Sequence, residues 1–434
     1  MTNSLRLLLG SLLLGASMLP ARGMDAPAAP EAAEHGAQSQ EAAAAPDAPN
    51  AADAPHQETP AALAEGRNTH WSDSRSPMPF DVMRSVQFLQ DQVARGNVRA
   101  IRVQALLLRR FGQTFLEAQP DVWNDPRNTR AVALFTFSGG TPDVIQALLQ
   151  QGRLPENEKP LFEGALAYVQ NDLPTAAKKL ESVAVDELEP VLAAQVSLAL
   201  GQIHQLDHPD TAVGHLALAR LLAPGTLIEE AALRLGVPLV DADGDHEAGD
   251  RLARRYFDAF HDSSYAANFE TRYVAMVVGR AMPDPQSTLL AMDGVVEALP
   301  VDRRQRLYLA AARRSLVSGN LQFATRSADR AIELAGLQPG DQARATLYRT
   351  ASSLGIDGQE ASRSALDGID RSLLHAEDQK LLDAAYSVLD SMAKPALMSE
   401  VSHVSPDAPE TSTILSRARA ALDAASLEMK KSQP

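Results

Sequence analysis

The sequence of 434 residues contains no cysteine. Without thiols, the chain can form no disulfide framework, no thiolate zinc site and no cysteine nucleophile. Aromatic residues are also scarce, at 5% of the chain, and tryptophan occurs only at Trp71 and Trp123. These two flank the first predicted helical hairpin, and packing explains them better than a carbohydrate-binding platform would.

The chain has fewer positive than negative side chains: 40 Lys and Arg residues against 55 Asp and Glu residues, which gives a net charge of -15. A phosphate backbone is repelled by such a chain, so nucleic acid is not an expected partner. A local cluster runs against this balance and consists of Arg303, Arg304, Arg306, Arg313 and Arg314. We interpret it as a solvated helix face, with a docking patch for an acidic protein as the alternative.

The signatures of common enzyme classes are missing as well. The sequence has no G-x-S-x-G elbow, no Walker loop and no H-E-x-x-H motif. Among exported helical enzymes, soluble lytic transglycosylases use a Glu within a Glu-Ser motif, and Glu181-Ser182 is the only faint match. It lies within a predicted repeat helix, and the segments that should follow it are absent. We therefore predict no catalytic residue, no cofactor site and no enzyme.

Two segments resemble metal sites. His204 and His208 are four residues apart, with Asp207 or His215 as a third ligand, but Pro209 ends the helix there. Residues 241–250, DADGDHEAGD, resemble a calcium loop, but its Gly and its closing acidic residue are out of place. We expect a hairpin turn at the first segment, an acidic loop between helical blocks at the second, and no metal at either.

Long apolar runs are confined to the start of the chain, where Arg6 precedes a run from Leu7 to Leu19. This pattern predicts a signal peptide over residues 1–23, cleaved after Gly23, because about 13 apolar residues are too few to span a bilayer. Residues 24–76 are rich in Ala, Pro, Glu and Asp and predict a disordered linker. No later window predicts a membrane helix, so we expect an exported protein that is not inserted in the membrane after cleavage.

Residues 77–405 show helical spacing of apolar residues nearly throughout, which predicts an all-α body. Pro79 begins the first helix, and Gly96-Asn97 separates it from the next. The predicted apolar face of the first helix consists of Val82, Val86, Leu89 and Val93. That of the second consists of Val98, Ile101, Ala105 and Leu108.

Three further segments partly match the tetratricopeptide (TPR) pattern of two helices per repeat. The first has Gly164, Tyr168, an Asn171-Asp172 turn, Ala176, Leu180 and Val183; the second has Gly201, Ala212, Leu216, Ala219 and Pro224; the third has Tyr308, Ala312, Gly319, Ala324, Ala328 and Ala331. Small residues let paired helices approach closely, and each hairpin needs a neighbour to cover its apolar face. We therefore predict degenerate TPR-like hairpins forming a solenoid, with an unrelated helical bundle as the alternative.

For residues 406–434, the last segment of the sequence, we predict a C-terminal linker and helix. Its apolar residues Ile414, Leu415, Ala418, Leu422 and Ala425 have helical spacing. Such a helix either caps the last repeat, which is our prediction, or reaches a partner.

The segment PFDVMRSVQFLQDQVARGNVRAIRVQ, residues 79–104, and the segment from Phe111 to Leu149 resemble the N-terminal region of the mature MotC family. The leader, the Ala/Pro-rich linker and the helical remainder are similar to that family too. The resemblance implies a periplasmic protein required for flagellar motor rotation, which binds the periplasmic part of the stator protein MotB. The alternative is a general periplasmic TPR-like adaptor for envelope assembly, division or secretion.

Overall fold

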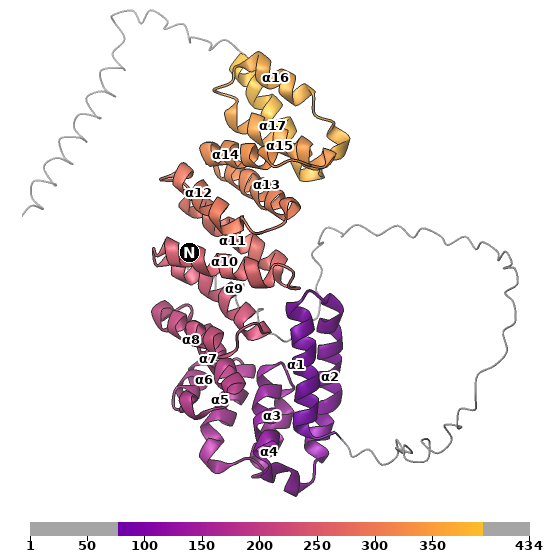
Figure 1. The fold of residues 1–434 in the computed structure, drawn as a ribbon, viewed down its shortest axis with the longest axis vertical. Coiled ribbons are helices and arrows are strands. Elements are labelled where there is room, and N and C mark those ends of the chain that lie inside the picture. Colours follow the sequence, from indigo (N-terminus) through magenta and orange to yellow (C-terminus); the bar gives the residue numbers. More distant parts are fainter. Residues whose placement is uncertain (1–76, 394–434) are drawn as a thin grey trace, which may run out of the picture. The chain divides into compact units, whose positions relative to one another are not determined.

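The computed structural model describes residues 77–393, and within that part of the chain it contains α-helices and short 3-10 helices without a single β-strand (Figure 1). The prediction of an all-α body is confirmed. The chain divides after Phe269 into two compact units. The predicted signal peptide, the linker over 24–76 and the tail over 406–434 lie outside the described residues.

The described part of the first unit, from residue 77 onward, consists largely of ten α-helices: α1 (Pro79–Ala94), α2 (Val98–Glu117), α3 (Pro126–Phe137), α4 (Pro142–Gln150), α5 (Lys159–Val169), α6 (Leu173–Leu180), α7 (Pro190–His204), α8 (Pro209–Leu222), α9 (Leu227–Ala242) and α10 (His246–Phe260). Helix α11 (Ala266–Arg280) carries the boundary. The second unit continues with α12 (Pro285–Val296), α13 (Val301–Ser318), α14 (Leu321–Glu333), α15 (Pro339–Ser353), α16 (Gln359–Asp367) and α17 (Ala376–Ala393).

Proline starts many of these helices instead of breaking them. Pro79, Pro126, Pro142 and Pro209 each occupy the first position of a helix, where no intrahelical partner for the N–H is needed. Side chains of Asp and Asn then cap several helices, as Asn320 does by accepting a hydrogen bond from the backbone N–H of Phe323 at 3.2 Å. These local signals explain why residues 77–393 are largely helical although the chain has 27 prolines.

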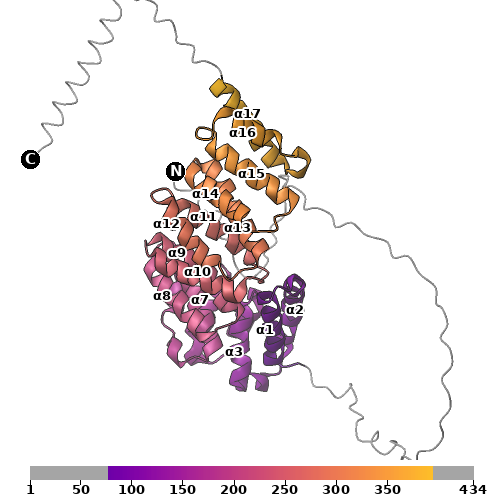
Figure 2. The ribbon, with the colours of Figure 1, turned by 45° about the horizontal axis from the view of Figure 1, so that its top comes forward.

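The three predicted repeat hairpins are confirmed as the pairs α5–α6, α7–α8 and α13–α14. In the first two, a glycine permits close packing, because a Cβ added at Gly164 or Gly201 would lie 2.6 or 2.7 Å from a Leu of the paired helix. In the third, Gly319 ends α13 with φ of 83°. Figure 2 shows α13 and α14 side by side.

Two details of the predicted packing are wrong. Val183 lies beyond α6, which ends at Leu180, although it still packs against the core of the first unit. On α2, Val98 is 64% exposed. The buried residues of α2 are Ala100, Gln104, Leu108, Gly112 and Phe115. The helix has more apolar residues than one face can hold, and Gly112 lies on the inner face, where an added Cβ would be 3.2 Å from the side chain of Val144 on α4.

The core of the first unit contains a cluster of aromatic side chains, in which the rings of Phe115 and Phe135 lie 4.6 Å apart and Trp123 is 5% exposed. The packing role predicted for Trp123 is confirmed, whereas Trp71 lies outside the described residues. In the second unit, Phe323 and Tyr348 are among the largest fully buried side chains. None of the helices within residues 77–393 combines the length and hydropathy needed to cross a membrane.

Candidate functional site

Buried and half-buried carboxylates are the first place to look for chemistry in this fold, and three of them share one arrangement. Each accepts a hydrogen bond from a tyrosine hydroxyl and pairs with an arginine. The three sets are Tyr256, Glu230 and Arg234; Tyr308, Asp293 and Arg330; and Tyr348, Asp378 and Arg313. The hydroxyl-to-carboxylate distances are 2.7, 2.6 and 2.8 Å.

The three tyrosines hold their protons firmly. Burial, reinforced by the neighbouring carboxylate, raises the pKa of Tyr256, Tyr308 and Tyr348 well above the usual range. Since each carboxylate already has both a donor and a cation, these sets join helices and offer no free general acid or base. They are structural links between helices.

Glu181, the only faint match to a lytic transglycosylase motif, is the C-cap of α6. Its side chain is 49% exposed and lies 2.8 Å from Nε2 of His204. A general acid of that enzyme class needs a carboxyl whose pKa is raised by burial. Glu181 does not have that environment.

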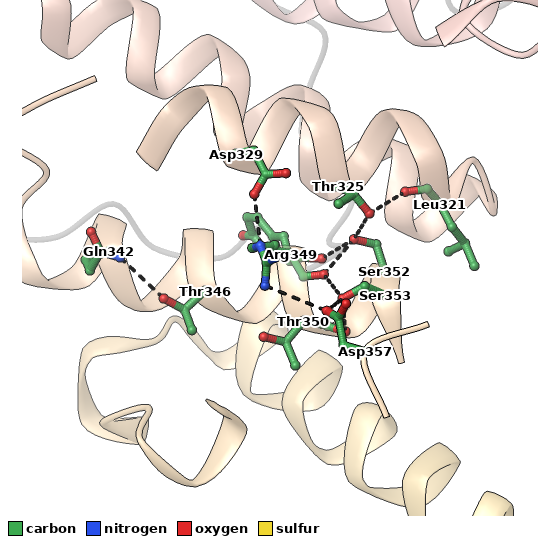
Figure 3. A network of polar contacts seen from close by, with 11 residues as sticks. Leu321, Thr325, Asp329, Gln342, Thr346, Arg349, Thr350, Ser352, Ser353 and Asp357 are labelled. Atoms are coloured by element: carbon green, nitrogen blue, oxygen red, sulfur yellow. Dashed lines mark hydrogen bonds and ion pairs between the residues drawn. The ribbon is translucent and has the colours of Figure 1, made fainter. Parts of the chain in front are cut away.

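A polar network on the second unit links α14 to α15 (Figure 3). Arg349 Nε donates to Asp329 at 2.9 Å, and the hydroxyls of Thr325 and Ser352 lie 2.8 Å apart. Ser353 Oγ donates to Asp357 at 2.5 Å. The residues labelled in the figure include no histidine or lysine to activate a serine, so the network joins two helices without forming a nucleophilic site.

The histidines of the candidate metal site meet at the α7–α8 turn. His204 ends α7, and His208 is the N-cap of α8. The ring of His204 lies 5.8 Å from that of His208 and 5.9 Å from that of His215. Among the residues that the structure describes, no group of three or more potential ligands is placed to hold a metal ion. Burial, followed by the charge of His204, lowers the pKa of His215.

The acidic segment 241–250 does connect two helices, as predicted, but the connection is only the turn over residues 243–245 and the rest of the segment is helical. Helix α9 runs to Ala242, α10 begins at His246, and Gly244 between them has φ of 95°. Asp245 accepts a hydrogen bond from the N–H of Ala248, and Asp241 lies 2.9 Å from His246. These carboxylates serve a tight helix–helix turn.

The arginine cluster on α13 is more than a solvated face. Arg303 pairs with Glu270 at 3.5 Å, Arg306 with Asp302 at 3.2 Å and Arg313 with Asp378 at 3.0 Å. Three of the five guanidinium groups therefore already have carboxylate partners within the second unit. That use of charge weakens the alternative of a docking patch for an acidic protein.

The best candidate for a binding site is a groove of about 640 Å³ in the first unit, formed by α8, α9 and α10. Its apolar residues are Val213, Leu216, Ala217, Leu233, Leu239, Val240 and Leu252. Small residues stand between them, including Ala232, Gly236 and Ala248. Because these small side chains cannot fill the space between three helices, the groove stays open.

The rim of this groove is charged. Asp210 and Arg220 belong to α8, Asp243 and Asp245 to the α9–α10 turn, and Arg251 to α10. Arg251 pairs with Glu247 at 2.6 Å. An apolar floor with a charged rim and no reactive group fits a peptide segment, for example an amphipathic helix that inserts two or three apolar side chains.

Sequence reasoning found the helices of this groove but not the groove itself. In the sequence, the apolar residues of the groove look like ordinary core residues. The spacing of apolar residues along a helix does not show whether another helix covers them. The small residues at Ala217, Gly236 and Ala248 were the available signal.

Comparison with known proteins gives a family. The family model described as chemotaxis protein MotC matches residues 13–433. A relative, chemotaxis protein MotC of Rhizobium meliloti (strain 1021), is 29% identical over 324 residues, which cover 74% of this chain and 73% of the relative.

Among solved structures, the TPR domain of P58(IPK) is similar at 12% identity and a TM-score of 0.23, covering 73% of this chain and 88% of that chain. The description of the fold as TPR-like hairpins rests on the hairpins of this chain itself. The MotC family is not a family of enzymes, and the TPR-like helical fold is not defined by an enzymatic activity. With a family match that spans nearly the whole sequence, the chain belongs to the MotC family of chemotaxis and motility proteins.

Proposed function

We propose that this chain is a non-enzymatic periplasmic protein required for flagellar motor rotation, and that it acts by binding the periplasmic part of the stator protein MotB. The observation that carries the proposal is the match of the MotC family over residues 13–433. The helical-hairpin fold is consistent with a binding role, because stacked hairpins offer extended surfaces for segments of a partner protein.

We place the MotB contact in the groove between α8, α9 and α10. A groove of about 640 Å³ with an apolar floor can take the side chains of one helix or extended segment. The charged rim gives orientation, since Arg220 and Asp243 favour opposite charges on the segment that they face.

The mechanism is a shift in a conformational equilibrium. If the groove binds MotB in its engaged state more tightly than in its disengaged state, binding stabilises the engaged state by the difference in binding free energy. A tenfold difference in affinity corresponds to about 1.4 kcal/mol. The protein itself performs no chemistry in this account.

The first experiment is a swimming assay with a count of flagellar filaments in a strain that lacks this gene. We expect full-length filaments that do not rotate, with rescue by the intact gene and no rescue by a gene that lacks residues 1–23. Normal swimming without the gene would contradict the proposal and would favour a general periplasmic adaptor.

A groove variant makes the test specific. Val213→Glu places a charge in the groove, whereas Leu221→Glu places the same charge on the same helix at a side chain that is 72% exposed and outside the groove. We expect the first variant, produced at wild-type levels, to fail to restore swimming and the second to restore it. Equal rescue by both would remove the groove from the proposal.

A further inference from the structure

The exposed face of α2 carries an unusual combination of side chains. Four arginines lie on it, Arg99, Arg102, Arg109 and Arg110, together with the exposed apolar residues Val98, Val103 and Leu106. We call these seven residues the α2 face. Leu106 is 57% exposed, Val98 64% and Val103 45%, so the apolar side chains are accessible to solvent.

Helical spacing orders the α2 face. Arg102, Leu106 and Arg110 are four residues apart, which places them in one row, and Arg99 and Leu106 are seven apart. Leu106 therefore lies between arginines on both flanks. Helix α2 lies beside α1 (Figure 1) and also packs on α4. Leu108 and Phe115, on the opposite side of the helix, belong to the core of the first unit.

Among the carboxylates of residues 77–393, none forms an ion pair with these four arginines. The only acidic residue of α2, Glu117, instead accepts a hydrogen bond from Gln113 at 2.9 Å. Elsewhere arginines are commonly paired, as Arg255 is with Glu229 at 2.8 Å and Arg330 with Asp293 at 2.6 Å. In a chain of net charge -15, four adjacent unpaired cations mark a surface for an anionic partner.

We propose that the α2 face binds the surface of a membrane that contains anionic phospholipids. Arginines that flank exposed apolar side chains on one helix are the pattern of interfacial helices, in which guanidinium groups bind phosphates and apolar tips enter the headgroup region. A lipid surface presents phosphates along all of α2, a helix of about 30 Å. It therefore satisfies all four guanidinium groups without any matched spacing, and it accepts Leu106, which an acidic peptide segment alone does not.

This surface is separate from the groove between α8 and α10, so the two contacts can form independently. Binding at the α2 face would hold the protein at a membrane without insertion of any helix. The inference does not depend on the identity of the partner in the groove.

The test is binding of the chain from residue 24 onward to lipid vesicles. The leader is left out because its apolar run would bind vesicles by itself. We expect binding to vesicles of equal parts phosphatidylglycerol and phosphatidylcholine, no binding to pure phosphatidylcholine, and weaker binding as salt rises. Each guanidinium at an anionic surface contributes about a fivefold factor to the partition coefficient.

The decisive variant replaces the four arginines with Gln, a residue that favours helix. We expect its partition coefficient to fall by more than about a hundredfold. The matched control replaces the exposed arginines Arg127, Arg306, Arg363 and Arg371 with Gln, which changes the net charge equally, and is expected to bind as the wild type does. Circular dichroism and melting curves check that both variants fold.

A single variant, Leu106→Ser, tests the apolar contribution. We expect it to lower binding by about fivefold and to leave the salt dependence unchanged, because no charge is lost. Three outcomes overturn the proposal: no binding of the wild type to anionic vesicles, equal losses in the two arginine variants, or binding to soluble polyglutamate without binding to vesicles. The last outcome would assign the α2 face to an acidic protein.

Discussion

Replacing Glu230 tests the account of the buried carboxylates as links between helices. The Glu230 side chain is fully buried on α9, and that of its partner Arg234, one turn later, is 5% exposed. Glu230 also accepts a hydrogen bond from Tyr256 of α10 at 2.7 Å, and the guanidinium of Arg234 lies 5.0 Å from the ring centre of Tyr265. One carboxylate therefore holds two helices and neutralises a buried cation.

The change Glu230→Leu leaves Arg234 buried without its counter-charge and Tyr256 without its acceptor. Removing one partner of a buried ion pair costs about 3–5 kcal/mol in the free energy of unfolding. The double change Glu230→Leu and Arg234→Leu removes both charges and is expected to be more stable than the single variant, since no buried charge remains.

Urea unfolding measures these effects, with the fluorescence of Trp123 in the same unit as the probe and Trp71 replaced by Phe. The matched control is Glu247→Leu, which removes the carboxylate of an exposed pair with the same spacing, Glu247 and Arg251, and should leave the unfolding midpoint nearly unchanged. A loss below about 1 kcal/mol for Glu230→Leu, or a double variant less stable than the single, would refute the reasoning.

Three further predictions concern packing and pH. Gly201→Ala brings a Cβ to 2.7 Å from Leu216 and should lower the free energy of unfolding by about 1–3 kcal/mol in the same urea assay. Its control is Gly214→Ala, where no atom lies within 4 Å of the added Cβ, and this change should raise the free energy of unfolding by up to about 1 kcal/mol. Gly96→Ala places a side chain at φ of +92° and a Cβ 2.4 Å from the carbonyl oxygen of Asp262. The melting temperature of this variant should fall well below that of the Gly152→Ala variant, where φ is +62° and the space around the added Cβ is open. The lowered pKa of His215 means that the unfolded chain binds a proton more readily, so stability should decline as pH falls below about 6.5, and His215→Gln should flatten that decline. Similar losses for both members of either glycine pair, or the same pH slope with and without His215, would contradict these expectations.

Much of the fold could be predicted from the sequence because its signals are local. Pro79 at a helix start, Gly319 with positive φ and the small residues Gly164 and Gly201 each act within one hairpin. Those features fixed where hairpins begin, turn and pack. They carry no information on which neighbouring hairpin covers which face.

The errors have the same origin. On α2 the apolar residues exceed one face, so spacing alone allowed Val98 to be assigned to the core, and the packing of α2 on α1 and α4 decides the orientation. That misassignment also hid the α2 face. The loop predicted within the acidic segment 241–250 is shorter in the structure, because Asp245 caps α10 and helix resumes directly after it.

Binding to the purified periplasmic region of MotB, measured by calorimetry, tests the central claim most directly. We predict that the wild-type chain from residue 24 onward and the Leu221→Glu variant bind MotB with the same affinity and that Val213→Glu binds at least tenfold more weakly, a change of about 1.4 kcal/mol. If the wild-type chain binds MotB no more tightly than an unrelated exported helical protein binds MotB, the claim is contradicted.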